Sequence, residues 1–220
     1  MVLVKICGIT NAADARSAVE VGANSLGFNF YPKSPRFIAK ADAAKIRTQL
    51  PASVESVGVF VNASAADVAA LCGEIKLGAA QLHGDESPEV VAELSRVLKV
   101  IKAFRVDDDF SLERLDEYGG AAAFLLDAAQ AGQYGGTGQT VDWGLARKAA
   151  AAHRIILAGG LTIANVGEAI RFVRPCGVDV ATGVESKPGR KDHGKVREFV
   201  EEVRRVEAET DQLIADEASA

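Results

Sequence analysis

Short apolar segments alternate with longer amphipathic segments along the whole chain. The short segments are rich in Val, Ile, Leu and Phe, which is typical of parallel strands that are buried on both faces. They predict eight strands, and each strand is followed by a segment with the spacing of a helix. The predicted strands are 2–7, 25–30, 54–61, 79–82, 100–104, 122–126, 154–157 and 178–180.

Helix-capping residues stand where several of the amphipathic segments begin. A side-chain oxygen at the N-cap accepts a hydrogen bond from the first helical turn, and proline is favoured at the first helical position. The predicted N-caps are Thr10 or Asn11, Ser64, Ser87 (followed by Pro88) and Thr162. Glycines favour helix C-termini, which is the prediction for positions 22, 73 and 119–120.

Eight strand-helix units in 220 residues predict an α/β fold with one domain, a (β/α)8 TIM barrel. An open doubly wound sheet also alternates strands with helices. The number of units favours the barrel, and so do the polar and glycine residues that recur just after the strands, where barrels build their active sites. We expect the barrel to span 1–206 and the acidic stretch 207–220 to extend the last helix or form a tail.

Composition narrows the classes of function. The net charge is -5 and no run of Lys and Arg stands out, so nothing indicates binding to nucleic acid. No apolar run approaches the roughly 20 residues that cross a bilayer, and the first residues lack a signal-peptide pattern. Cys7, Cys72 and Cys176 are odd in number and widely spaced, which argues against disulfides and a zinc site. We therefore expect a cytoplasmic protein with reduced thiols and no metal.

Two residues at strand ends are candidates for acid-base chemistry. Cys7 ends the first predicted strand, and Asp127 follows the sixth. A thiol whose pKa is lowered by its surroundings would suit proton abstraction next to a carbonyl or imine, and a small buried apolar residue is the alternative. A carboxyl group that is partly removed from water can act as a proton donor, and an Asp that caps the following loop is the alternative.

Three glycine clusters follow the late strands. Glycines let backbone N–H groups approach an anion, and barrels often bind phosphate with the loops after strands 7 and 8. Any one cluster is equally consistent with an ordinary turn, but clusters in consecutive loops predict a phosphate site. The residues predicted to form it are Gly136, Gly138, Gly159, Gly160, Thr182 and Gly183.

Polar residues also follow the second and fourth predicted strands. Arg36 lies in a proline-stiffened loop at 31–36, where it would clamp a carboxylate with two hydrogen bonds or remain solvated at the surface. Gln81 and His83 alternate with Leu82 and so share one face of the strand. Either residue would line the barrel mouth, with a structural histidine as the alternative for His83.

Several motifs in a fixed order connect these observations. They are Lys-Ile-Cys-Gly-Ile-Thr at 5–10, Phe-Tyr-Pro-Lys-Ser-Pro-Arg at 30–36, Val-Gly-Val-Phe-Val-Asn at 57–62, Gln-Leu-His-Gly at 81–84, Leu-Leu-Asp at 125–127, Gly-Gly-Thr-Gly at 135–138, Leu-Ala-Gly-Gly-Leu at 157–161 and Asp-Val-Ala-Thr-Gly-Val-Glu at 179–185. From Lys5 to about Asp192 the chain resembles the phosphoribosylanthranilate isomerase family. It departs from the family at Ala181-Thr182-Gly183, where Ser-Ser-Gly is frequent, and at Asn29, where an apolar residue is usual.

The resemblance implies an isomerase that performs an Amadori rearrangement in tryptophan biosynthesis. It would convert N-(5-phosphoribosyl)anthranilate to 1-(2-carboxyphenylamino)-1-deoxyribulose 5-phosphate without a cofactor. The resemblance assigns the base to Cys7, the acid to Asp127, the anthranilate carboxylate to Arg36 and the phosphate to the glycine loops. The expected partner is this phosphorylated small molecule, and the expected assembly is a monomer or a homodimer.

Two rival functions remain open from the sequence. The histidine-pathway isomerase and its bifunctional relative resemble this architecture and chemistry, but they use Asp at the position of Cys7 and a second phosphate site in the first half of the chain. A non-catalytic barrel that only binds a phosphorylated ligand is the other rival. The presence of both Cys7 and Asp127 argues against it.

Overall fold

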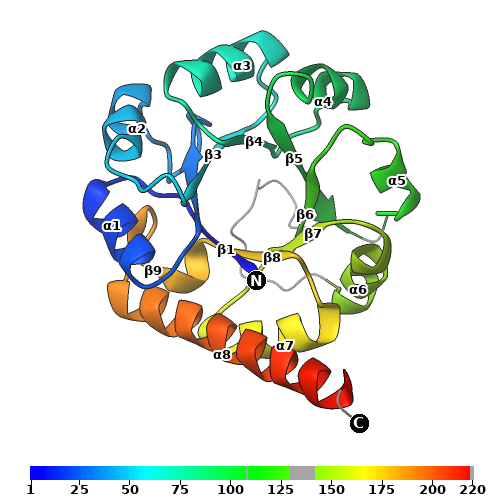
Figure 1. The fold of residues 1–220 in the computed structure, drawn as a ribbon. Helices are drawn as coiled ribbons and strands as arrows, with labels where there is room; N and C mark the ends of the chain where they lie inside the picture. Colours follow the sequence, from blue (N-terminus) through cyan, green and yellow to red (C-terminus); the bar gives the residue numbers. More distant parts are fainter. Residues whose placement is uncertain (108, 129–141, 219–220) are drawn as a thin grey trace.

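A closed barrel of eight parallel strands forms the centre of the molecule. The structure is a computed structural model, and it describes residues 1–107, 109–128 and 142–218. Each strand pairs with the next in sequence, and β8 pairs with β1 (Figure 1). The strands are β1 (Leu3–Cys7), β2 (Ser25–Asn29), β3 (Glu55–Phe60), β4 (Ala79–Leu82), β5 (Lys99–Val106), β6 (Ala123–Ala128), β7 (Ile155–Leu157) and β8 (Gly177–Val180).

Helices follow the strands and form an outer ring around the barrel (Figure 1). They are α1 (Ala12–Glu20), α2 (Lys40–Arg47), α3 (Ala65–Glu74), α4 (Pro88–Leu94), α5 (Glu113–Asp116), α6 (Trp143–Ala152), α7 (Ile163–Val173) and α8 (His193–Ala218). Between β8 and α8 lie a short 3-10 helix η1 (Thr182–Val184) and a hairpin of β9 (Glu185–Lys187) and β10 (Arg190–Lys191). The predicted barrel is confirmed, and the β1–β8 pairing excludes an open sheet.

Side chains alternate between two buried layers along each strand. Outward residues such as Ile6 and Phe28 belong to a large cluster that the helices cover. Inward residues form a separate, smaller cluster, which consists of Val57, Ala79, Ile101, Ala103, Ala123, Leu125, Ile156 and Ala158. Most inward side chains at mid-barrel are apolar. The polar inward residues Gln81 and Asp127 lie near the carboxyl ends of β4 and β6.

The predicted helix starts agree with the structure, but one predicted helix end does not. The side chains of Asn11 and Ser64 accept hydrogen bonds from the first turns of α1 and α3, and Ser87 is the N-cap of α4. Gly73 lies inside α3 rather than after it. The chain leaves α3 through Lys76, which has a left-handed φ of 54°. Sequence-based reasoning favoured glycine there because lysine seldom adopts this conformation.

The last helix, α8, closes the ring between α1 and α7 (Figure 1). One face of it buries Phe199, Val200 and Val203 against the rest of the core. Arg204 on the same helix donates to the carbonyl oxygens of Val2, at 2.9 Å, and Gly22, at 3.2 Å. In the part of the chain that the structure describes, neither α8 nor any other helix is long and apolar enough to cross a membrane.

Candidate active site

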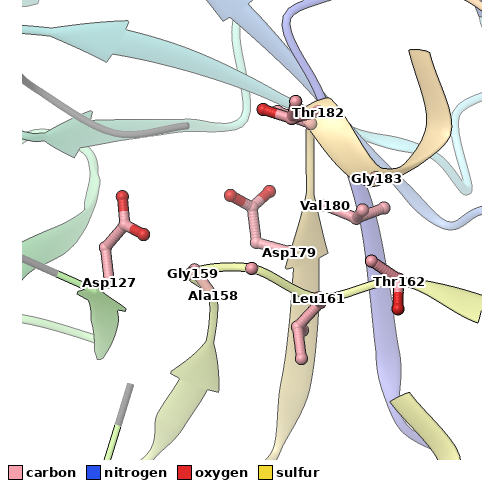
Figure 2. Close-up of a pocket in the computed structure, with 11 residues that line it drawn as sticks. Asp127, Ala158, Gly159, Leu161, Thr162, Asp179, Val180, Thr182 and Gly183 are labelled. Carbon is pink, nitrogen blue, oxygen red and sulfur yellow. The ribbon is translucent and has the colours of Figure 1, made fainter. Parts of the chain in front are cut away.

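A pocket of about 140 Å³ opens at the carboxyl ends of β6, β7 and β8. Figure 2 shows the carboxylates of Asp127 and Asp179 in this pocket, close to the loop that begins at Gly159. Four predicted phosphate-site residues line it, namely Gly159, Gly160, Thr182 and Gly183. Gly136 and Gly138 lie outside the described residues. Among the described residues, no group of three or more His, Cys, Asp or Glu side chains is placed to hold a metal ion.

Two of these glycines are required by close backbone contacts. Gly159 has a left-handed φ of 76°, and a Cβ atom there would lie 2.4 Å from the amide nitrogen of Ala128 and 3.0 Å from Oδ1 of Asp127. A Cβ atom on Gly183 would lie 2.1 Å from the carbonyl oxygen of Leu161. The loops after β7 and β8 therefore pack closely against each other and against the end of β6, and their glycines line the pocket.

Asn165, a polar residue near the start of the apolar helix α7, holds the loop after β7. Its Oδ1 accepts a hydrogen bond from the amide of Thr162 at 2.7 Å, and its Nδ2 donates to the carbonyl oxygen of Gly160 at 3.0 Å. These bonds fix the glycine loop to the N-terminus of α7. A fixed loop at a helix N-terminus is an arrangement that favours anion binding.

Three predicted site residues come together at the carboxyl ends of β4 and β6, namely Asp127, Gln81 and His83. Asp127 is buried, and its Oδ1 accepts a hydrogen bond from the amide of Ala128 at 2.9 Å. Its Oδ2 lies 3.4 Å from Nε2 of His83. On the far side of the imidazole, Nε2 of Gln81 lies 2.8 Å from Nδ1 of His83. The structure thus places Gln81 behind His83, and His83 beside the carboxylate of Asp127.

Cys7 lies in a group of buried charges that the sequence-based reasoning did not identify. Lys5, two residues before it on the same face of β1, is 0% exposed and donates to Oδ1 of Asp179 at 2.7 Å. The register of the barrel pairs Lys5 with Asp179 on β8. A lysine and an aspartate inside the apolar first and last strands were the available signal, because a barrel makes these strands neighbours.

The pKa of the Cys7 thiol is raised in this setting, whereas the sequence-based prediction of a base called for a thiol with a lowered pKa. Burial is the largest cause, and the nearby Asp179 carboxylate also raises it. The ammonium groups of Lys5 and Lys191 act in the opposite direction. Cys72 provides a comparison, since burial in α3 alone raises the pKa of its thiol to about 12. Cys7 differs from Cys72 in having nearby cations that stabilise its thiolate.

Arg36 is held by a carboxylate and lies against Cys7's neighbour Gly8. Its Nε and Nη2 donate to the two carboxylate oxygens of Glu185 at 2.8 and 2.7 Å, and Nη2 also donates to Oγ1 of Thr182 at 3.2 Å. Gly8 has a φ of 77°, and a Cβ atom there would lie 2.5 Å from Cδ of Arg36. The side chain of Arg36 is 14% exposed, so the solvated-surface alternative is wrong.

Glu185, at the start of the β9–β10 hairpin, is a second site residue that the sequence-based reasoning missed. It accepts hydrogen bonds from Nζ of Lys191 at 3.0 Å and from the amide of Gly189 at 3.3 Å, in addition to those from Arg36. Burial opposes its ionisation, but Arg36 and Lys191 outweigh burial and lower the pKa of Glu185. The hairpin therefore carries the carboxylate that orients Arg36.

Asn29, the polar departure from the family pattern, anchors the loop that carries Arg36. Its Oδ1 accepts a hydrogen bond from the amide of Tyr31 at 2.9 Å. Its carbonyl oxygen accepts one from the amide of Ile38 at 3.0 Å, at the other end of the loop. An apolar side chain at position 29 would not make the first of these bonds.

Comparison with known proteins agrees with this geometry. The model of the N-(5'-phosphoribosyl)anthranilate isomerase family matches residues 4–202. The chain belongs to this family. It is 50% identical over 201 residues to N-(5'-phosphoribosyl)anthranilate isomerase of Trichlorobacter lovleyi, covering 91% of this chain and 97% of that protein. The crystal structure of the Thermotoga maritima enzyme superposes with a TM-score of 0.86 at 41% identity, covering 93% of this chain and 99% of that one.

Membership in the phosphoribosylanthranilate isomerase family decides between the open alternatives. The activity predicted from the motifs, isomerisation of phosphoribosylanthranilate in tryptophan biosynthesis, is confirmed. Both the histidine-pathway isomerase and the non-catalytic barrel are set aside. The individual roles of the site residues are a separate question, which the geometry of the barrel mouth addresses.

Proposed function

We propose that Cys7 is the general base and Asp127 the general acid of the rearrangement. Asp127 lies in the same pocket as the glycine loops, and Asp179 links that pocket to the β1 side of the mouth, where Cys7 lies. β1 and β6 are not neighbours in the barrel. The arrangement thus presents a proton donor and a proton acceptor to different sides of a bound sugar, which is the observation that carries the proposal.

The substrate is held at its two anionic ends. The phosphate binds to the backbone of the loops after β7 and β8, at Gly159, Gly160, Thr182 and Gly183. A crystal structure of a family member contains reduced 1-(o-carboxyphenylamino)-1-deoxyribulose 5-phosphate, which is a phosphorylated ligand of the expected class. Arg36 receives the anthranilate carboxylate. Its Nε and Nη2 are engaged by Glu185 and Thr182, so Nη1 is the guanidinium nitrogen that the described residues leave for the substrate.

The reaction proceeds in two proton-transfer stages. Asp127 first donates its proton to the furanose ring oxygen, the bond from that oxygen to C1 breaks, and the nitrogen lone pair forms a Schiff base at C1. The thiolate of Cys7 then removes the proton from C2, and the C2–H electrons move toward the imine to form an enol-amine. Protonation at C1 and loss of the O2 proton give the ketone product. Each group contributes on the order of 10²- to 10⁴-fold to the rate.

Gln81 and His83 support Asp127 in this scheme. Gln81 holds one nitrogen of the imidazole, so that the other faces Oδ2 of Asp127. His83 therefore orients the carboxyl group toward the pocket and remains near enough to contact a sugar hydroxyl. Gln81 and His83 are still predicted to bind the substrate in addition to this positioning role.

Two predictions about the setting of the enzyme also belong here. The expected partner is the phosphorylated substrate alone, in the cytoplasm. One family member, from Thermotoga maritima, is described as a dimer from which monomers were generated. For this chain a monomer or a homodimer is the prediction, and its hydrodynamic size in solution distinguishes the two.

A fluorescence assay of phosphoribosylanthranilate consumption tests the catalytic assignments. Cys7→Ala and Asp127→Asn are expected to reduce kcat on the order of 10²- to 10⁴-fold, because each removes one proton-transfer group. Cys176→Ser is the matched control, since this partly buried thiol lies outside the pocket. Near-wild-type turnover by either Cys7→Ala or Asp127→Asn would show that the corresponding assignment is wrong.

A further inference from the structure

Lys5 is a charged side chain in an unusual place. It lies inside the barrel on β1 and is completely buried. Lysine is almost never fully buried unless its charge is paired. Its partner is Asp179, at 2.7 Å, and the two side chains come from neighbouring strands whose other inward positions are small or apolar. Because a buried ion pair is weak support for stability in itself, this pair calls for another explanation.

The missing side chain of Gly27 creates the space in which Lys5 and Cys7 meet. A Cβ atom on Gly27 would lie 3.0 Å from Nζ of Lys5 and 2.8 Å from Sγ of Cys7. Both atoms therefore occupy the same small volume next to β2. Any larger residue at position 27 would displace the ammonium group, the thiol, or both.

The charges around Cys7 do not balance while its thiol is protonated. Three cations act on the thiol, namely Lys5 on β1, Lys191 on β10 and Arg36 in the loop after β2. Two carboxylates neutralise them in part, because Asp179 pairs with Lys5 and Glu185 pairs with both Arg36 and Lys191. These five groups leave one excess positive charge. A thiolate at Cys7 brings their sum to zero.

We propose that Lys5 is a positioning residue that stabilises the thiolate of Cys7, and that Asp179 fixes the Lys5 ammonium beside it. This inference rests on the proposed function, in which Cys7 is the base. Asp179 has two opposed effects in this arrangement. It places the stabilising cation, and its own negative charge disfavours a second anion nearby.

The pKa shifts of Lys5 and Cys7 agree with these opposed effects. Burial lowers the pKa of the Lys5 ammonium, but Asp179 and Cys7 outweigh burial and raise it. Lys5 is therefore charged at neutral pH. For Cys7, burial and then Asp179 raise the thiol pKa, and Lys5 is the first of the groups that oppose them. Removing Lys5 and removing Asp179 should therefore shift the Cys7 thiol in opposite directions.

The experiment measures the rate of Cys7 alkylation by iodoacetamide as a function of pH. All proteins carry Cys72→Ala and Cys176→Ala, so that Cys7 is the remaining thiol. Lys5→Met should slow alkylation at a fixed pH below the thiol pKa by about tenfold or more, because one pKa unit is a factor of ten in thiolate. Asp179→Asn should accelerate it by a similar factor. The acidic limb of the kcat/KM profile should move to higher pH in Lys5→Met, and Lys5→Arg should restore it in part.

Two outcomes would overturn the inference. One is a Lys5→Met variant that alkylates with the wild-type pH dependence, and the other is an Asp179→Asn variant whose alkylation is unchanged or slower. If Lys5→Met fails to fold, Asp179→Asn decides alone, because the amide oxygen of Asn can still accept the hydrogen bond from Lys5 and hold the ammonium group while the negative charge is removed. Full turnover by Cys7→Ala would instead refute the proposed base, and that result is independent of the alkylation measurements.

Discussion

The two sides of the barrel mouth surround their reactive groups differently. On the side of β1 and β8, Cys7 lies among buried charges, with Lys5 and Asp179 at hydrogen-bond distance from each other. On the side of β4 and β6, Asp127 is contacted by a backbone amide and by His83. The difference matches the proposed tasks. A base must be stabilised as an anion before it acts. An acid must keep its proton until it acts, and nearby cations would favour the loss of that proton.

Neutralising Glu185 should produce the largest change on the charged side. Glu185→Gln leaves Arg36 and Lys191 buried without their carboxylate, and we expect a loss of about 3–5 kcal/mol in the free energy of unfolding at neutral pH. KM for phosphoribosylanthranilate should rise as well, because Arg36 is no longer oriented. Chemical denaturation and steady-state kinetics measure the two effects.

The same variant makes a prediction about acid stability. The pKa of Glu185 is lowered in the folded protein, so its contribution is present above the unfolded-state pKa and is lost as the pH falls through the folded-state value. The difference in stability between wild type and Glu185→Gln should therefore be full at neutral pH and shrink in acid. A difference that stays constant down to low pH would contradict this electrostatic account.

Filling the space at Gly27 should have a smaller effect on stability but a direct one on the base. Gly27→Ala places a methyl group within 3.0 Å of Lys5 Nζ and Cys7 Sγ, and we expect a loss of about 1–3 kcal/mol together with reduced kcat. Gly73→Ala in α3 is the matched control. A Cβ atom there meets nothing within 4 Å, so this change should stabilise the protein by about 0.5–1 kcal/mol. Equal outcomes for the two variants would contradict the close packing around Cys7.

On the acid side, the smallest effect is expected from His83. His83→Asn removes the imidazole whose Nε2 lies 3.4 Å from Oδ2 of Asp127 and should reduce kcat about two- to tenfold, in keeping with the loss of one weak polar contact. The pH dependence of Cys7 alkylation should not change, because His83 lies on the other side of the mouth. A change in that dependence would show that the two sides are not separate.

The sequence predicted the fold well, because the fold depends on local patterns, and the positions of Cys7 and Asp127 at strand ends made them the candidate reactive residues. Strand β4 has the predicted bounds, because an apolar run marks them, and helix α7 begins directly after its predicted N-cap, Thr162. The charges that tune Cys7 depend instead on contacts between distant segments. Lys5 meets Asp179 only because the barrel closes, and Arg36 meets Glu185 across 149 residues.

The surroundings of Cys7 show most clearly what pattern reasoning leaves out. The sequence-based prediction of a base at Cys7 called for a thiol with a lowered pKa. The burial of Cys7 depends on how tightly the neighbouring strands pack, and a sequence motif does not reveal it. The structure shows a thiol whose pKa is raised by that burial and countered by Lys5. The role of Cys7 as the base remains a prediction, and it requires a compensating cation that single-residue reasoning did not supply.

The separate roles of the two sides can be tested most directly by trapping the ring-opened Schiff base with borohydride during single turnovers. Cys7→Ala keeps the acid and lacks the base, so it should open the ring. Borohydride should then reduce the Schiff base of the bound substrate to an open-chain amine, which is the adduct that is measured. Asp127→Asn should yield no more adduct than a reaction without enzyme. Adduct formed by Asp127→Asn above that background, or none formed by Cys7→Ala, would contradict the assignment of Asp127 as the acid and Cys7 as the base.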